Sequence, residues 1–296
     1  MQKACKEGRR DIVDLMILNK DTDYYRGLLG ACEGGHLELV KMMLEIGADY
    51  YYNRGLASAC EGGHESIVKL LLSLGATNYE LSLEAACRGG HLKVIKMMID
   101  LGATYYDRGL VGACKGGHLE LIKMMIELGA NHYEWGLQGA CEGGHNSIVK
   151  MMLELGATDY DHGLSYACIG GHIEIVKMML SLGANEYNWG LYDACKGGHI
   201  EIVKMMLELG ANDYNWGLEG ACERGHVEVV KMMIQLGAND YFYLKYGNLA
   251  LNIMYIRLTR QVIDLPIKKQ HHEYHLLKIY GKKIPDIDRL INKYLF

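Results

Sequence analysis

The amino-acid sequence predicts an all-α fold, a solenoid of about nine helix–turn–helix repeats that ends in a helical C-terminal cap. Nine cysteines recur along the chain of 296 residues, 27 apart in every interval except one of 28. A fixed period between about 20 and 50 residues is the signature of a repeat architecture. Each period holds two short stretches in which apolar residues have helical spacing, with glycines between them. The chain contains only two prolines, which favours helices over a loop-rich fold.

Several residue types keep this spacing. The cysteines are Cys5, Cys32, Cys60, Cys87, Cys114, Cys141, Cys168, Cys195 and Cys222. Four residues after a cysteine stand His36, His64, His91, His118, His145, His172, His199 and His226. Each period also contains one tyrosine of the set Tyr52, Tyr79, Tyr106, Tyr133, Tyr160, Tyr187, Tyr214 and Tyr241. The interval of 28 comes from one extra residue in the connection 49–52, and loops tolerate such insertions.

The unit at residues 188–214 shows the predicted elements in order. Asn188 is expected to cap the first helix, because an Asn side chain accepts hydrogen bonds from the free backbone N–H groups there. The same place is held in other units by Asn53, Asp107, Asp161 and Asn215, with Glu80 and Glu134 as weaker caps. The first helix is predicted over residues 189–196. Its buried stripe is formed by Leu191, Ala194 and Cys195.

A glycine pair and a second helix complete the unit. Gly197 and Gly198 end the first helix, because glycine adopts the left-handed conformation of a helix terminus at little cost. The second helix is predicted from about His199 to Leu209. Its buried face is formed by Ile202, Val203, Met206 and Leu207. Helices this short are unstable alone in water, so each unit must stack on its neighbours.

The repeated unit resembles the ankyrin repeat. Residues 190–212, GLYDACKGGHIEIVKMMLELGAN, lie on the family's core pattern of TPLHxAAxxGHxEIVxxLLxxGAD. The match recurs in eight units over residues 27–242, and residues 1–26 form a looser ninth unit. The resemblance implies a helical solenoid that binds another protein on its concave face.

The units also depart from the family pattern. Trp-Gly-Leu or Arg-Gly-Leu replaces the initial Thr-Pro-Leu-His, and the period of 27 is shorter than the family's usual length of about 33. The missing residues are those of the family's protruding β-hairpin, so we expect hairpins that are reduced or absent. Compressed, near-identical repeats rich in Tyr and Met are similar to those of ankyrin proteins from giant DNA viruses that infect amoebae. A viral origin is therefore one expectation of the resemblance.

Charge and spacing divide the chain into two parts. Residues 1–242 are predicted to form the repeat array, with the first repeat as an N-terminal cap, and residues 243–296 a divergent helical C-terminal cap. The array carries a net charge of −11, whereas the C-terminal part has 10 Lys and Arg against 4 Asp and Glu. An acidic array argues against nucleic acid as a partner. No apolar run approaches the roughly 18 residues that cross a bilayer, so no membrane partner is expected.

The repeated Cys and His residues invite a metal, disulfide or catalytic interpretation. One Cys per unit, at a position that faces the core, has the wrong spacing for structural zinc and suits a small apolar filler. Stacked helices lie too far apart for disulfides, and free thiols indicate an intracellular protein. His271 and His275 form the best metal candidate, but no third ligand has suitable spacing. We therefore predict no metal, no cofactor, no small-molecule substrate and no enzymatic activity.

The positions that vary from unit to unit are the candidates for partner binding. The position before the first-helix Gly, and one on the same helix face, carry residue types that dominate interfaces. The predicted contact residues are Arg54, Arg108, Trp135, Tyr192, Trp189 and Trp216. A second interpretation stays open, in which the Trp rings simply cover the loop Tyr of the next unit.

These observations support a non-enzymatic scaffold that binds an unidentified protein partner. The alternative hypothesis is an adaptor that recruits substrates to a host ubiquitin ligase and docks through residues 243–296. Its only sequence support is Leu265-Pro266, which loosely resembles the start of an F-box. The expected location is intracellular, in the host cytoplasm if the protein is viral.

Overall fold

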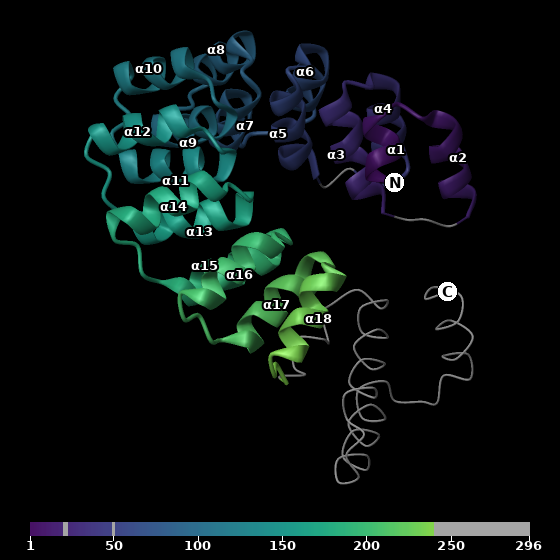
Figure 1. Cartoon of the computed structure of the whole chain (residues 1–296). Coiled ribbons are helices and arrows are strands. Elements are labelled where there is room, and N and C mark those ends of the chain that lie inside the picture. Colours follow the sequence, from purple (N-terminus) through teal and green to yellow (C-terminus); the bar gives the residue numbers. More distant parts are fainter. Residues whose placement is uncertain (20–22, 49–50, 240–296) are drawn as a thin grey trace, which may run out of the picture. The chain divides into compact units, whose positions relative to one another are not determined.

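The computed structural model describes residues 1–19, 23–48 and 51–239. Within these residues the backbone forms eighteen α-helices and no strand (Figure 1), which confirms the all-α prediction. The helices belong to two compact units, residues 1–184 and residues from 185 onward. The predicted C-terminal cap, residues 243–296, lies outside the described residues.

The helices alternate between a first and a second helix of each repeat. The first unit contains α1 (Gln2–Lys6), α2 (Arg10–Leu18), α3 (Tyr24–Gly34), α4 (Leu37–Glu45), α5 (Tyr52–Gly62), α6 (Glu65–Ser73), α7 (Tyr79–Gly89), α8 (Leu92–Asp100), α9 (Tyr106–Gly116), α10 (Leu119–Glu127), α11 (Tyr133–Gly143), α12 (Asn146–Glu154), α13 (Tyr160–Gly170) and α14 (Ile173–Leu182). The described part of the second unit contains α15 (Tyr187–Gly197), α16 (Ile200–Glu208), α17 (Tyr214–Arg224) and α18 (Val227–Gln235). Within each unit, first helices pack on the first helices of neighbouring repeats, and each second helix packs on the first helix of its own repeat.

The core follows the predicted stripes. In the repeat of α9 and α10, Leu110 and Cys114 of the first helix and Ile122 and Met125 of the second are fully buried. In α16 the predicted residues Ile202, Val203 and Met206 are buried, whereas Leu207 is half-buried. The apolar stripe that each isolated helix would expose is thus covered by its neighbours, which is the main source of stability in such a stack.

The predicted N-cap is wrong. Each full-length first helix begins at the loop Tyr, so Asn188 is its second residue and Glu186 stands at the N-cap of α15. In the first unit, the cap hydrogen bonds come from Asp23, Asn78 and Asp159, each of which accepts from the third helical N–H. The helix begins earlier than expected because the side chain at its second position has another partner.

That partner is the backbone of the following repeat. Asp107 Oδ1 accepts hydrogen bonds from the N–H groups of Asn131 and His132, both at 2.8 Å, in the loop before α11. Asn53 makes the same pair of bonds at 2.7 and 2.9 Å, to Thr77 and Asn78. Glu80, Glu134 and Asn188 also bind the next loop in this way. The predicted caps are therefore clamps between repeats.

Within each compact unit, the turn between the two helices of a repeat is closed by a histidine of the next repeat where both residues are described. Gly117 ends α9 with φ +81°, and a Cβ there would lie 2.6 Å from Cε1 of His145. The same imidazole donates from Nε2 to the carbonyl oxygen of Lys115 over 3.1 Å. His64, His118 and His172 make the equivalent bond. The repeated His thus binds backbone of the preceding repeat.

A close approach of backbones joins first helices where their seventh residue is small. At Gly112 in α9, a Cβ would lie 2.1 Å from the carbonyl oxygen of Glu84 in α7. Gly30 of α3 meets the carbonyl oxygen of Gln2 at the same distance. A hydrogen atom at this position is therefore what permits the two helices to touch.

We predict that Gly112→Ala lowers the free energy of unfolding by about 1–3 kcal/mol, because the added methyl group must push α7 and α9 apart. This loss exceeds the gain of about 1 kcal/mol that Ala brings to a helix interior. The measurement is urea unfolding followed by circular dichroism. Gly55→Ala is the matched control, since its Cβ would meet only side-chain atoms at 3.4 Å or more. Equal stability of the two variants would contradict the close-approach argument.

We predict that Asp107→Ala destabilises the protein by about 1–2 kcal/mol, because two backbone N–H groups lose their acceptor. Asp107→Asn is expected to unfold at nearly the same urea concentration as the parent, since Asn53 makes the same two bonds in its own repeat. If Asn were as harmful as Ala, the negative charge and not the hydrogen bonding would hold the clamp.

Candidate functional site

One side of each first helix carries the residues that differ most between repeats. The third, sixth and tenth helical residues share this side because their spacing brings them together on a helix. We call it the first-helix face. Its third positions are Arg26, Arg54, Leu81, Arg108, Trp135, His162, Trp189 and Trp216. Its sixth positions are Leu29, Ala57, Glu84, Val111, Gln138, Ser165, Tyr192 and Glu219, and its tenth positions begin with Glu33, Glu61, Arg88 and Lys115.

The two predicted arginines of this face contact the repeat before their own. Arg54 donates from Nη1 to the hydroxyl oxygen of Tyr25 over 2.9 Å, and its Cζ lies 6.0 Å from the centre of that ring. Arg108 donates from Nη1 to Oε2 of Glu84 over 3.1 Å. Variation at these positions is thus matched by variation in the neighbouring repeat.

Trp135 lies against two aromatic side chains of the preceding loops. Its ring stacks on His132 with centres 4.8 Å apart, and meets Tyr105 at 5.9 Å in a nearly perpendicular arrangement. This aromatic cluster is still open to solvent, because 37% of Trp135 and 38% of Tyr105 remain exposed. The structure therefore places Trp135 against the N-cap Tyr of the preceding repeat, and not over the loop Tyr of the next.

The second unit brings Tyr192 and Trp216 together. Their rings stack with centres 4.8 Å apart and planes at 24°. Tyr192 donates from its hydroxyl to Oε1 of Glu223 over 3.1 Å, and Lys196 reaches Oε2 of Glu223 at 2.7 Å. The hydrogen bond from Lys196 lowers the pKa of the Glu223 carboxyl, so this pair is ionised at neutral pH. Trp189, the remaining predicted residue of this unit, is 39% exposed.

The tenth position holds ion pairs that the sequence analysis missed. Opposite charges 27 residues apart meet across neighbouring first helices, in the pairs Lys6–Glu33, Glu61–Arg88, Lys115–Glu142 and Lys196–Glu223. The signal was present in the sequence as opposite charges 27 residues apart at one position of these repeats, although Glu33 and Glu61, and likewise Arg88 and Lys115, have the same sign. Such partly exposed pairs add little stability each.

The cysteines are all buried and free. Burial raises the pKa of Cys114 to about 12, and five other cysteines are shifted as far by the same cause. A thiol with so high a pKa is protonated at neutral pH and is a poor nucleophile or metal ligand. Within the part of the chain that the structure describes, no group of three His, Cys, Asp or Glu side chains has the geometry of a metal site.

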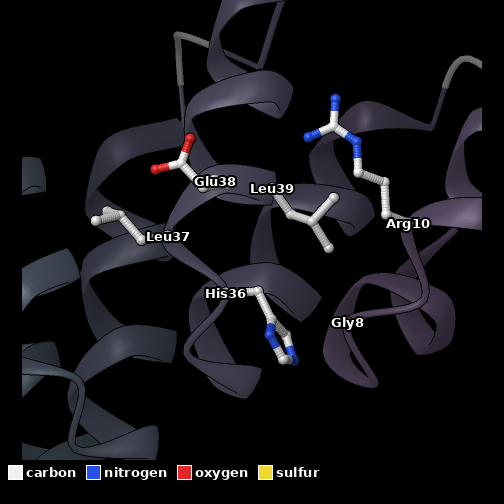
Figure 2. Close-up of a pocket in the computed structure, with 6 residues that line it drawn as sticks. All are labelled: Gly8, Arg10, His36, Leu37, Glu38 and Leu39. Carbon is white, nitrogen blue, oxygen red and sulfur yellow. The ribbon is translucent and has the colours of Figure 1, made fainter.

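A shallow hollow of about 300 Å³ lies beside the first turn. Figure 2 shows the ring of His36 directed at the turn that carries Gly8, with the side chains of Arg10 and Leu39 above them in the view. His36 is engaged by the carbonyl oxygen of Lys6 at 3.0 Å. The hollow thus lies beside the contact between Gly8 and His36, which is the same histidine–glycine contact that joins other repeats.

Comparison with known proteins agrees with the repeat geometry. A family model described as "Ankyrin repeats (3 copies)" matches residues 1–82, 28–109, 110–188 and 137–216. The chain belongs to the ankyrin repeat family. Ankyrin repeats are protein-interaction modules and typically not enzymes, so the family indicates a protein partner.

Similar solved structures include the human ASB11 ankyrin repeat domain, which is 27% identical. The likeness covers 56% of this chain and 91% of that one, with a TM-score of 0.37. No curated protein sequence gives a significant match. Among the described residues, no helix is both long and apolar enough to span a membrane.

We predict that the folded protein reacts with Ellman's reagent at pH 8 only as fast as it opens, and that all nine thiols react after unfolding in guanidinium chloride. The raised thiol pKa also sets the direction in which the free energy of unfolding changes with pH. The unfolded chain ionises its thiols from about pH 9 and the folded chain only near pH 12, so the free energy of unfolding falls as pH rises between these values. One rapidly reacting thiol in the folded protein would contradict the uniform burial.

Proposed function

We propose that the chain is a non-enzymatic interaction scaffold whose protein partner binds the first-helix face. The observation that carries the proposal is the exposure of Trp135 and Trp189, at 37% and 39%, on first helices whose other described large apolar side chains are buried or half-buried. Trp is a residue type that dominates binding energy at protein interfaces. The proposed contacts are Arg54, Arg108 and Trp135 in the first unit and Trp189, Tyr192 and Trp216 in the second.

Within each compact unit, the repeat frame supports this proposal because it holds the first-helix face in a fixed shape. The clamp residues and the histidine contacts hold successive first helices together, so little conformational freedom remains to be lost on binding. In ankyrin repeat proteins the equivalent face is the concave side that meets the ligand. The nine free thiols support a reducing, intracellular location.

The experiment is site-specific photo-crosslinking of the full chain in cells. Benzoyl-phenylalanine at position 135 or 189 is expected to crosslink to the partner, whereas the same residue in place of Leu119 or Ile200 is not. Leu119 and Ile200 are matched controls, because they are exposed to 45% and 37% on second helices.

We predict that the double variant Trp135→Ala, Trp189→Ala recovers at least tenfold less of the crosslinked partner in affinity purification. Losses of this size are typical of large aromatic residues at the centre of an interface. Leu119→Ala, Ile200→Ala is the control pair. Equal recovery with both pairs would show that the partner binds elsewhere.

A further inference from the structure

We propose that the first-helix face holds a lysine or arginine side chain of the partner at one place, between α9 and α11. The site consists of the rings of Tyr105 and Trp135 with the carboxylate of Asp107. This inference rests on the proposed function, because it names the chemistry that the partner must present there.

The two rings form a corner that is open to solvent. Their planes stand at 76° with centres 5.9 Å apart, and more than a third of each residue is exposed. His132 stacks on the indole and fixes its orientation. The face of an aromatic ring carries partial negative charge, and Trp attracts a cation most strongly. The corner therefore favours a positive group.

The carboxylate beside the rings carries a charge that its structural role does not need. Asp107 binds the N–H groups of Asn131 and His132, the residue that stacks on Trp135, and forms no ion pair within the described residues. Asn53 performs the same clamp without a charge. The nearest cation of α9, Arg108, is already engaged by Glu84. The negative charge of Asp107 thus remains uncompensated next to the exposed rings.

Other rings of the same face are occupied by cations of this chain. Arg54 lies over the ring of Tyr25, and Lys196 lies 5.3 Å from the centre of the Tyr192 ring. Over Tyr105 and Trp135 the described part of the chain places no Lys or Arg. The face therefore uses aromatic–cation contacts elsewhere, and at α9–α11 the cation must come from outside.

The openness of the corner decides what kind of ligand it suits. One exposed aromatic–cation contact changes a binding constant by about two- to fivefold, which is too little to retain a free small cation. A side chain held in place by the remainder of a bound protein needs no more than this. The site therefore contributes more to the specificity for a partner than to the total binding affinity.

The test uses the full chain with Trp189→Phe and Trp216→Phe, which leaves Trp135 as its one tryptophan. The probe is an acetylated Gly-Ser-Arg-Ser-Gly-Arg-Ser-Gly peptide, and its control has citrulline, a neutral isostere, in place of both arginines. Because the site alone binds weakly, the peptides are titrated to high concentration, and we expect the Arg peptide to change Trp135 emission with at least threefold higher affinity than the citrulline peptide.

The decisive variant is Asp107→Asn, which removes the charge and keeps an oxygen acceptor for the clamp. It is expected to weaken binding of the Arg peptide about three- to tenfold, with an unchanged urea midpoint. Glu201→Gln on α16 removes the same charge from a second helix of the other compact unit and should leave the affinity unchanged. An equal loss in both variants would reduce the effect to net charge and overturn the proposal.

Two further outcomes separate the possible errors. If Trp135 responds only after Lys268, Lys269, Lys282 and Lys283 are changed to Gln, the chain's own basic segment fills the site and our choice of a separate partner is overturned. If a partner crosslinks at position 135 but binds the parent and the Asp107→Asn variant equally, the scaffold function stands and the cation site does not.

Discussion

The contact between one imidazole and the glycine turn of the preceding repeat is the constraint on which the array depends. His145 fills the space that a side chain on Gly117 would need, and also bonds to the carbonyl oxygen of Lys115. The turn must therefore be glycine for two reasons, its positive φ and the ring above it. Because the same atoms meet at several junctions, assembly fixes histidine and glycine in most repeats, although Arg9 stands in place of the histidine in the first repeat.

A second set of contacts joins the opposite ends of the first helices. The side chains at the second helical position bind the loop of the next repeat, so a first helix is held at its beginning by a clamp and at its end by a histidine. Between these points the buried Leu, Ala and Cys leave no room for variation. Freedom to vary is left to the exposed side, and this is why the first-helix face differs from repeat to repeat.

Variation on that face has two physical origins. Some varying residues form ion pairs with varying residues of the neighbouring repeat, as Arg108 does with Glu84 and Lys196 with Glu223. Others are not balanced within the described residues. Trp135 stays partly exposed, and the Asp107 carboxylate beside it forms no ion pair there. A partner is expected to be selected by the second kind, because residues of the first kind already have their contacts. Counting variable positions alone would have treated both kinds as binding residues.

The sequence by itself determined the period, the pair of helices in each repeat and the buried cysteine stripe, because all of these follow from spacing along one chain. It also located the first-helix face. It did not determine that Asn188 and its equivalents are clamps, since that depends on the distance between consecutive loops in space. The pairing of charges 27 residues apart and the corner formed by Tyr105 and Trp135 likewise required the tertiary structure. Side chains from different repeats meet only when the helices are stacked, and the spacing of the stack is set by backbone contacts that no residue pattern records.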